Sequence, residues 1–242
     1  MASKAFFAFS SEERSDAKAR RGRELPPAST STVTQLASDE QGWLLAPDSL
    51  SSTGSITTLA DVGSHAAQLL TFVTGRSIRR VMADCATMAP PGGPRSPDDC
   101  NMLLRLEGGV RGVMIASQAT AGKNNGFHLS VYGSRGGLFW HQEMPESLEF
   151  AATDAPRVTF VRGGSGLCAS AIAASRIPVG HPEGFIEAFA NLYRNFHATV
   201  TEGAPPDFPS AEDGAAGLAF VEAALKSSAE EQWVDVAPIG NA

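Results

Sequence analysis

The sequence contains few cysteines, and their spacing excludes the usual disulfide and zinc arrangements. Cys85, Cys100 and Cys168 are the three cysteines; they are scattered, odd in number and have no C-x-x-C spacing. Secreted disulfide scaffolds use even sets of cysteines, and zinc sites use closely spaced ligands. The pattern therefore predicts reduced thiols in a cytoplasmic protein.

Long hydrophobic runs and excess positive charge are also missing. No apolar run approaches the ~20 residues that a membrane-spanning helix requires, and the short apolar stretch 5–9 precedes mixed charges instead of a cleavage site. The net charge is -7 and the pI about 5.2. This balance argues against a nucleic-acid or anionic-membrane partner, because both attract basic surfaces.

The chain is long enough to bury a substantial core, with 242 residues of which 43% are hydrophobic. Residues 1–40 are charged or rich in proline, serine and threonine, and we expect this segment to be poorly structured. The apolar residues 41–45 are expected to form a strand or an anchor for a domain that occupies residues 41–242.

Residues 61–75 show the periodicity of one amphipathic helix. Four apolar residues recur at three- and four-residue steps; they are Ala66, Leu69, Leu70 and Val73. Asp61 lies where a carboxylate can cap the helix, and Gly75 lies where a left-handed residue can end it. Asp61 and His65 are four positions apart, so both side chains lie on the same face of the helix.

Short β-rich segments follow, separated by glycine, proline or asparagine. The predicted strands are 77–86, 100–106, 110–118, 127–133, 138–142, 147–150, 157–161 and 233–236. Glycines at 107–109 and 133–137 predict hairpin turns, and hairpins imply antiparallel pairing.

Two helices are expected near the end of the chain, at 182–201 and 211–228. The apolar stripe of the first contains Phe185, Phe189, Leu192, Phe196 and Val200. In the second, Ser210 is the expected N-cap, and the residues expected to pack inward are Leu218, Val221, Ala224 and Leu225.

One helix, a run of strands and two helices predict an α+β fold, a mostly antiparallel sheet with helices on one face. Apolar residues on both strand faces predict a homo-oligomer that associates through the sheet.

The stretch 164–169 fits the pattern G-x-G-x-x-A after a predicted strand. A dinucleotide fingerprint must lead into a helix that returns to a parallel strand. Only residues 167–175 could be helical here before Pro178, and no second hydrophobic strand follows. We therefore interpret the stretch as a glycine-rich loop.

Several stretches together resemble the C-terminal domain of the Gfo/Idh/MocA (glucose–fructose oxidoreductase/inositol dehydrogenase) family. They occur in the family's order at 61–65, 97–99, 116–118, 122–126, 131–137, 176–184, 187–193 and 208–214. The resemblance covers residues 41–236. It implies NAD(P)-dependent oxidation or reduction of a sugar or polyol, with the cofactor held by an N-terminal Rossmann domain and the C-terminal domain contacting the substrate.

Carried over to matching positions, the resemblance implies that His65 is the catalytic acid or base on the substrate hydroxyl. Asp61 would orient His65 or bind a neighbouring hydroxyl, and Gly63 would allow the helix start to approach the ligand. The residues by themselves leave another interpretation open, in which Asp61 is only a helix cap and His65 a packed histidine.

Three further residues are candidate substrate contacts. Arg176 and His181 lie in a polar loop before a helix start, a place that binds hydroxyls or carboxylates. The alternative is that His181 caps the helix and that Arg176 pairs with Glu183. Asn125 could bind substrate or serve only as a turn residue beside Gly126.

The sequence departs from the family in one large respect, because we find no Rossmann domain, cofactor glycine loop or Glu-Lys-Pro motif. NAD(P) is implied by the family, but we expect the isolated chain to have no site for it and no metal site. The chain is therefore predicted to be a substrate domain that is inactive alone. The alternatives are a non-catalytic sugar-binding or oligomerisation module and a purely structural dimer domain.

Overall fold

A computed structural model describes residues 33–36, 58–88 and 96–239. The first sheet has five strands in the order β1-β4-β3-β2-β9. They are β1 (Val33–Leu36), β2 (Ile78–Ala86), β3 (Asp99–Leu106), β4 (Arg111–Ser117) and β9 (Val234–Asp235). Pairing is antiparallel except between β1 and β4.

The second sheet has the order β5-β6-β7-β8 and is wholly antiparallel. Its strands are β5 (His128–Gly133), β6 (Gly136–His141), β7 (Ser147–Ala152) and β8 (Val158–Val161).

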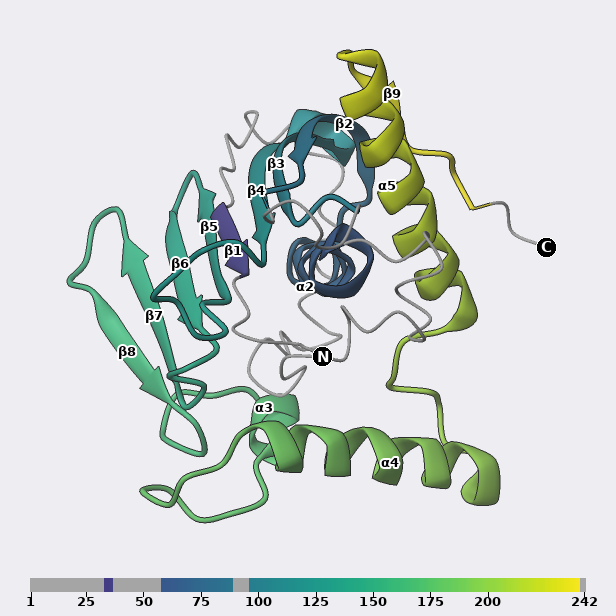
Figure 1. Cartoon of the computed structure of the whole chain (residues 1–242). Helices are drawn as coiled ribbons and strands as arrows, with labels where there is room; N and C mark the ends of the chain where they lie inside the picture. Colours follow the sequence, from purple (N-terminus) through teal and green to yellow (C-terminus); the bar gives the residue numbers. More distant parts are fainter. Residues whose placement is uncertain (1–32, 37–57, 89–95, 240–242) are drawn as a thin grey trace.

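The expected α+β architecture with mostly antiparallel pairing is confirmed, although the strands form two sheets instead of one. β1 occupies the edge of β4, so β5 starts a new sheet beside β1 (Figure 1). The predicted hairpin turns are both present. Gly108 and Gly109 have φ of 71° and 76°, which explains why glycine is needed between β3 and β4.

The strand β1 lies inside the segment 1–40 that we expected to be poorly structured. Its four residues pair in parallel with residues 113–116 of β4, which gives backbone hydrogen-bond partners to an otherwise open sheet edge. The other residues of that segment, and the apolar stretch 41–45, lie outside the described residues.

The helix predicted at 61–75 is present in two parts. A π-helical turn, η2 (Leu59–Gly63), runs directly into α2 (Ser64–Thr74). Gly75 ends α2 in the left-handed conformation with φ 63°, as predicted. The prediction that Asp61 caps the helix is wrong. The N-cap position is Thr58, and Asp61 lies within the π turn because the helix begins two residues earlier than expected.

Helix α5 (Ala211–Glu230) begins as predicted, with a reciprocal capping box. The N–H of Asp213 donates to Ser210 Oγ at 3.1 Å, and the N–H of Ser210 donates to Asp213 Oδ2 at 2.8 Å. The buried face of α5 differs from the prediction at one position. Leu218 is 64% exposed, because the face turned to the sheet is centred on Phe220, Val221 and Ala224.

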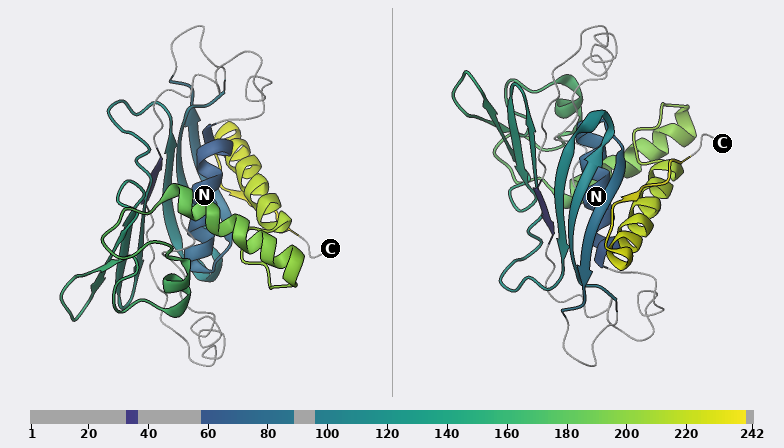
Figure 2. Two further views of the ribbon diagram at one scale, coloured as in Figure 1. Left: turned by 90° about the horizontal axis from the view of Figure 1, so that it is seen from below. Right: turned by 90° about the horizontal axis from the view of Figure 1, so that it is seen from above.

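The helices α2 and α5 pack against each other on one face of the five-stranded sheet, and the second sheet lies toward the other side (Figure 2). Buried side chains of both sheets, α2 and α5 form one hydrophobic core. Trp140 is 4% exposed and meets Phe127 edge-on at 5.7 Å, so it belongs to this core.

The helices α3 (Ala169–Ala174) and α4 (Phe185–Glu202) lie at one end of the molecule (Figure 1). α4 begins at Phe185, so Pro182 and Glu183 precede it and are not its first turn. Three residues of its predicted apolar stripe face solvent, since Phe185, Phe196 and Val200 are 67%, 55% and 67% exposed, whereas Phe189 and Leu192 are partly buried. The neighbouring Ile186 and Tyr193 are 76% and 71% exposed. Among the described helices, none has both the length and the apolar character needed to cross a membrane.

Candidate functional site

His65 lies in the first turn of α2, directly after the π turn that contains Asp61. Both side chains are half-buried, and the charge of Asp61 acts on the His65 imidazole. Single π turns at the ends or within α-helices occur frequently at functional sites. The structure therefore brings the two candidate catalytic residues together on one helix segment.

The π turn is held at the end of β4 by a small hydrogen-bond network. The Thr58 hydroxyl donates to Gln118 Oε1 at 2.6 Å, and the Thr58 N–H donates to the Pro97 carbonyl at 3.3 Å. The N–H of Gln118 donates to the Asp98 carbonyl at 2.8 Å. Two segments that are distant in the sequence, 97–98 and the end of β4, thus converge on the start of the helix that carries Asp61 and His65.

Gly63 contributes to packing in this region. A Cβ atom built on Gly63 would lie 2.5 Å from Leu59 Cδ1 and 3.6 Å from Ala116 Cβ. Gly63 is buried, so its lack of a side chain allows the helix to contact β4 closely. The structure thus explains the glycine at position 63 by close packing of the helix on β4, a role that the family resemblance did not imply.

Burial lowers the pKa of His65 below its ordinary value of 6.5, and the negative charge of Asp61 partly opposes this effect. The imidazole is therefore neutral at pH 7 and can accept a proton. Because the folded pKa lies below the unfolded one, the unfolded chain binds the proton first. The stability that neutral His65 contributes is present above pH 6.5 and is lost as the pH falls through the range below it.

The His65 C2–H resonance is expected to show a midpoint below pH 6.5, and Asp61→Asn is expected to move the midpoint further down because a favourable negative charge is removed. An NMR titration measures both values, with His65→Gln identifying the signal. A midpoint that rises in Asp61→Asn would contradict the proposed charge interaction.

Arg176 and His181 belong to a different cluster, centred on Arg162 at the end of β8. The Arg162 guanidinium lies 2.6 Å from Glu183 Oε2 and 3.2 Å from Glu146 Oε1. It also donates to the carbonyls of Ile177 at 2.8 Å and His181 at 2.7 Å. The cluster thereby attaches the loop before α4 to the second sheet.

The two candidates take part in this cluster mainly through their backbone. The N–H of Arg176 donates to the Glu183 carboxylate at 2.9 Å, whereas its Nε donates to Asn191 Oδ1 at 2.8 Å. The side chain of His181 is exposed. Among the contacts recorded for the described residues, none joins Arg176 or His181 to His65.

Sequence reasoning missed Arg162, Glu146 and Asn191 as members of this cluster. Arg162 and Asn191 are 5% and 9% exposed, although both residue types are usually found at surfaces. A single arginine after a strand does not indicate a buried ion-pair cluster. Glu183 lay in the first turn of the helix predicted at 182–201, so the pattern indicated another role for it. The separation of 21 positions between Arg162 and Glu183 can be closed only by the tertiary structure.

Asn125 is exposed in the loop between β4 and β5. Among the hydrogen bonds of the described residues, none involves its side chain. The neighbouring Gly126 has φ 61° and donates its N–H to Glu143 Oε1 at 2.9 Å, so the turn interpretation of this loop is consistent with the structure.

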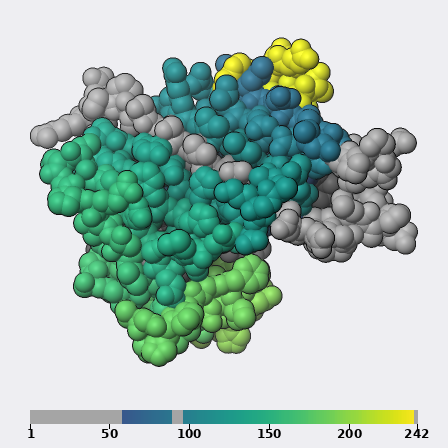
Figure 3. All heavy atoms as spheres, turned by 60° about the vertical axis from the view of Figure 1, so that its left-hand side comes forward, coloured from purple at the N-terminus to yellow at the C-terminus, as the bar shows by residue number. Residues whose placement is uncertain are grey.

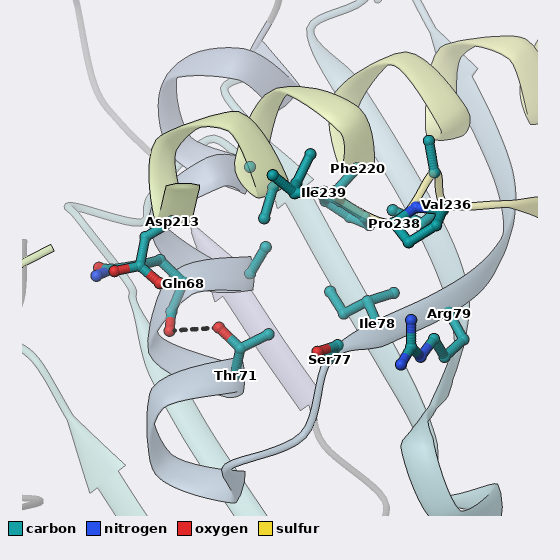
Figure 4. Close-up of a pocket in the computed structure, with 14 residues that line it drawn as sticks. Gln68, Thr71, Ser77, Ile78, Arg79, Asp213, Phe220, Val236, Pro238 and Ile239 are labelled. Carbon is teal, nitrogen blue, oxygen red and sulfur yellow. Dashed lines mark hydrogen bonds between the residues drawn. The ribbon is translucent and has the colours of Figure 1, made fainter. Parts of the chain in front are cut away.

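A cavity of about 400 Å³ lies between α2, α5 and the residues that follow β9 (Figure 4). Polar groups from Gln68, Thr71, Asp213 and Arg79 lie around it, together with the apolar side chains of Phe220 and Ile239. His65 and Asp61 do not line this cavity. The described pocket and the candidate catalytic pair therefore occupy different parts of the same helix.

The glycine stretch 164–169 forms a loop, as the sequence indicated. It follows β8, an edge strand of an antiparallel sheet, and leads into α3, which has only six residues. A dinucleotide cradle needs a parallel strand and a longer crossover helix. The residues of this loop therefore do not fit NAD(P).

Comparison with known proteins agrees with this architecture. Residues 29–139 match the family model of the GFO/IDH/MocA C-terminal domain. An uncharacterized oxidoreductase, YfiI, of Bacillus subtilis is 25% identical over 189 residues, which are 73% of this chain and 47% of the relative. Levoglucosan dehydrogenase of Pseudarthrobacter phenanthrenivorans is 29% identical over 188 residues, 72% of this chain and 46% of the relative.

Solved structures extend the likeness to nearly the whole chain. An inositol dehydrogenase homolog from Azotobacter vinelandii, complexed with NADH and myo-inositol, has a TM-score of 0.73 and 30% identity. The match covers 92% of this chain and 60% of that protein. The chain thus spans about half the length of the curated relatives it matches. By its matched residues, its fold and these relatives, the chain is similar to the C-terminal domain of the Gfo/Idh/MocA family, whose model matches residues 29–139.

Proposed function

We propose that this chain is the substrate-binding domain of an NAD(P)-dependent sugar or polyol oxidoreductase and depends on a separate cofactor-binding domain for turnover. The observation that carries the proposal is the half-buried His65, whose pKa is lowered by burial, beside Asp61 at the start of α2. The names of the relatives support the substrate class, since they include levoglucosan dehydrogenase and a homolog complexed with myo-inositol.

In this proposal His65 handles the proton of the reaction. Oxidation of a carbinol removes a hydride from carbon and a proton from the hydroxyl. A neutral imidazole can accept that proton, and Asp61 then stabilises the imidazolium that forms. NAD(P), when held by another domain, supplies the hydride acceptor. Arg176, His181 and Asn125 remain candidate substrate contacts of lower rank, because each lies in an exposed loop and Arg176 is already bonded to Asn191.

The exposed stripe of α4 supports the need for a second domain. This exposed surface consists of three residues of the predicted stripe, Phe185, Phe196 and Val200, together with Ile186 and Tyr193; each is more than half exposed. Contiguous apolar surface of this kind marks an interaction site. We assign it to the cofactor-binding domain, because relatives that bind NADH are longer than this chain by about the length of such a domain.

The second sheet supports a homo-oligomer. Its face away from the core carries Tyr132 and Phe139 in edge-on contact at 5.5 Å, with Arg157 placed 5.1 Å from the Phe139 ring. Figure 3 shows this sheet as a broad surface next to α3 and α4. Aromatic and arginine side chains are enriched at protein interfaces, so this face is the proposed contact between two copies of the chain.

The experiment that tests the proposed function combines the chain with the cofactor-binding domain of the Azotobacter relative. Polyol-dependent NADH formation is expected from the mixture and from neither component alone. Ile186→Glu, a change on the exposed stripe of α4, is expected to weaken the restored activity, with Glu202→Gln at the helix end as control. Tight NADH binding by the isolated chain in a fluorescence titration would contradict the proposed division of labour.

The alternative is a non-catalytic module that binds a sugar-like ligand or assembles with longer relatives. A thermal-shift screen with myo-inositol and other polyols separates the possibilities, since a bound ligand raises the unfolding temperature. A shift without turnover in the mixture favours the module, and no shift with any polyol favours a structural dimer domain.

A further inference from the structure

Two of the three cysteines, far apart in the sequence, are direct neighbours in the first sheet. Cys85 on β2 pairs in register with Cys100 on the antiparallel strand β3. Directly paired residues place their side chains on the same face of a sheet. Both thiols are reduced in the structure, and they are hydrogen-bonded to each other.

The backbone hydrogen bonds of Cys85 show whether it and Cys100 form a hydrogen-bonded or a non-hydrogen-bonded antiparallel pair. The N–H of Cys85 donates to Ser228 Oγ on α5 at 2.9 Å, and its carbonyl accepts from the same hydroxyl at 3.5 Å. The N–H of Ala83, two residues earlier, likewise donates to Ser227 Oγ at 2.9 Å. The backbone groups of Cys85 therefore point away from β3, so the pair with Cys100 is a non-hydrogen-bonded one.

This geometry is compatible with a disulfide. Non-hydrogen-bonded antiparallel pairs have Cα atoms about 4.5 Å apart and closely spaced side chains. A disulfide requires a Cα separation of roughly 4.4–6.8 Å. In a hydrogen-bonded pair the side chains lie farther apart. The serine contacts from α5 therefore show that Cys85 and Cys100 form the type of pair that favours a disulfide.

The two thiols differ in the way that stepwise oxidation requires. Cys85 is half-buried and can be reached from solvent, whereas Cys100 is completely buried. The hydrogen bond from the Cys100 thiol lowers the pKa of Cys85, and this interaction together with burial raises the pKa of Cys100. Cys85 is therefore the thiol that forms a thiolate and attacks first.

We propose that Cys85 and Cys100 form a reversible cross-strand disulfide, with a low-molecular-weight disulfide such as oxidised glutathione as oxidant. The Cys85 thiolate attacks one sulfur of glutathione disulfide, forms a mixed disulfide and releases one glutathione thiolate. Cys100 loses its proton and attacks the Cys85 sulfur, which releases the second glutathione thiolate. The two protein thiols are oxidised by two electrons, and one glutathione disulfide is reduced to two thiols.

The disulfide would close the connection between β2 and β3. That connection includes Pro97 and Asp98, whose carbonyls accept the hydrogen bonds from Thr58 and Gln118 at the start of the His65 helix. Oxidation would therefore tie together the strand ends that support the candidate catalytic pair, and the inference holds whether or not the proposed function is correct.

Peptide mapping of the full chain tests this inference directly. The chain is equilibrated in glutathione buffers of defined ratio, quenched with acid, alkylated under denaturing conditions and digested with trypsin. Cleavage at Arg80, Arg95 and Arg105 places the two cysteines on different peptides, 81–95 and 96–105. The expected product is a disulfide-linked pair of these peptides, lighter than the two thiol forms by two hydrogen atoms and lost again on reduction.

Three variants sharpen the result. Cys100→Ser is expected to accumulate a stable glutathione adduct on Cys85, because no second thiol resolves it. Cys85→Ser is expected to leave Cys100 alkylated in every buffer, and Cys168→Ser to form the linked pair as the parent chain does. The inference is overturned if the parent chain shows only alkylated cysteines, only a glutathione adduct on Cys85, or a bond to Cys168.

Discussion

Replacing His65 by alanine is expected to lower turnover by about 10²–10⁴-fold in a mixture of the chain with a cofactor-binding domain. The variant removes the neutral imidazole that would accept the hydroxyl proton, while the hydride acceptor on the other domain is unchanged. Binding of the polyol is expected to persist, because the lost group acts on the proton and not on the ligand as a whole. Steady-state kinetics and a polyol thermal shift measure the two effects.

The matched control lies on the same helix. Gln68 is one turn after His65 and lines the cavity between α2 and α5, so Gln68→Ala is expected to keep turnover near the parent value. For the parent mixture, kcat/KM is expected to fall as the pH drops below 6.5 and protonated His65 accumulates. Turnover by His65→Ala that equals the parent's would exclude His65 as the proton-handling group.

Replacing Glu183 by glutamine is expected to reduce the free energy of unfolding by about 3–5 kcal/mol. The ion pair between Glu183 and Arg162 is 2.6 Å long, and the two side chains are 4% and 6% exposed. The neutral amide leaves the Arg162 guanidinium buried without its main countercharge. It also removes an acceptor that serves the N–H groups of Arg176 and Ile177. Urea unfolding monitored by circular dichroism measures the loss.

Glu149→Gln provides the matched control for this prediction. Glu149 pairs with Arg157 at 2.8 Å, but the two side chains are 43% and 59% exposed. Exposed pairs contribute about 0–1 kcal/mol, because water screens both charges. If Glu183→Gln and Glu149→Gln reduced the free energy of unfolding equally, burial of the Glu183–Arg162 pair would not increase its contribution to stability. Replacing Arg162 by methionine in the Glu183→Gln chain is expected to recover part of the loss, since no buried charge remains.

Local patterns predicted most of the secondary structure. Glycine at 107–109 and 133–137 favours tight turns because it adopts positive φ without strain. Gly108, Gly109 and Gly136 do have positive φ, and both hairpin turns are present. Ser210 and Asp213 are three positions apart, a spacing that produces a capping box whatever the rest of the chain does. The apolar face of α5 was harder to locate, because nearly every position there is small or apolar and the pattern does not single out one face.

Family motifs pointed to Asp61 and His65, and the structure brings these two residues together because four positions on a helix correspond to about one turn. The motifs did not reveal that Asp61 lies in a π turn instead of at a cap, since that depends on Thr58 contacting Gln118 across the fold.

By itself the sequence determined the order of most helices and strands, the antiparallel hairpins and the chemical identity of the candidate pair, because these depend on periodicity, turn residues and short spacings. Only the tertiary structure decided that Cys85 meets Cys100, that Arg162 meets Glu183 and that part of the apolar stripe of α4 faces solvent. Each of these depends on strand register or on how distant segments pack, and contacts between residues far apart in the chain leave no periodic pattern in it.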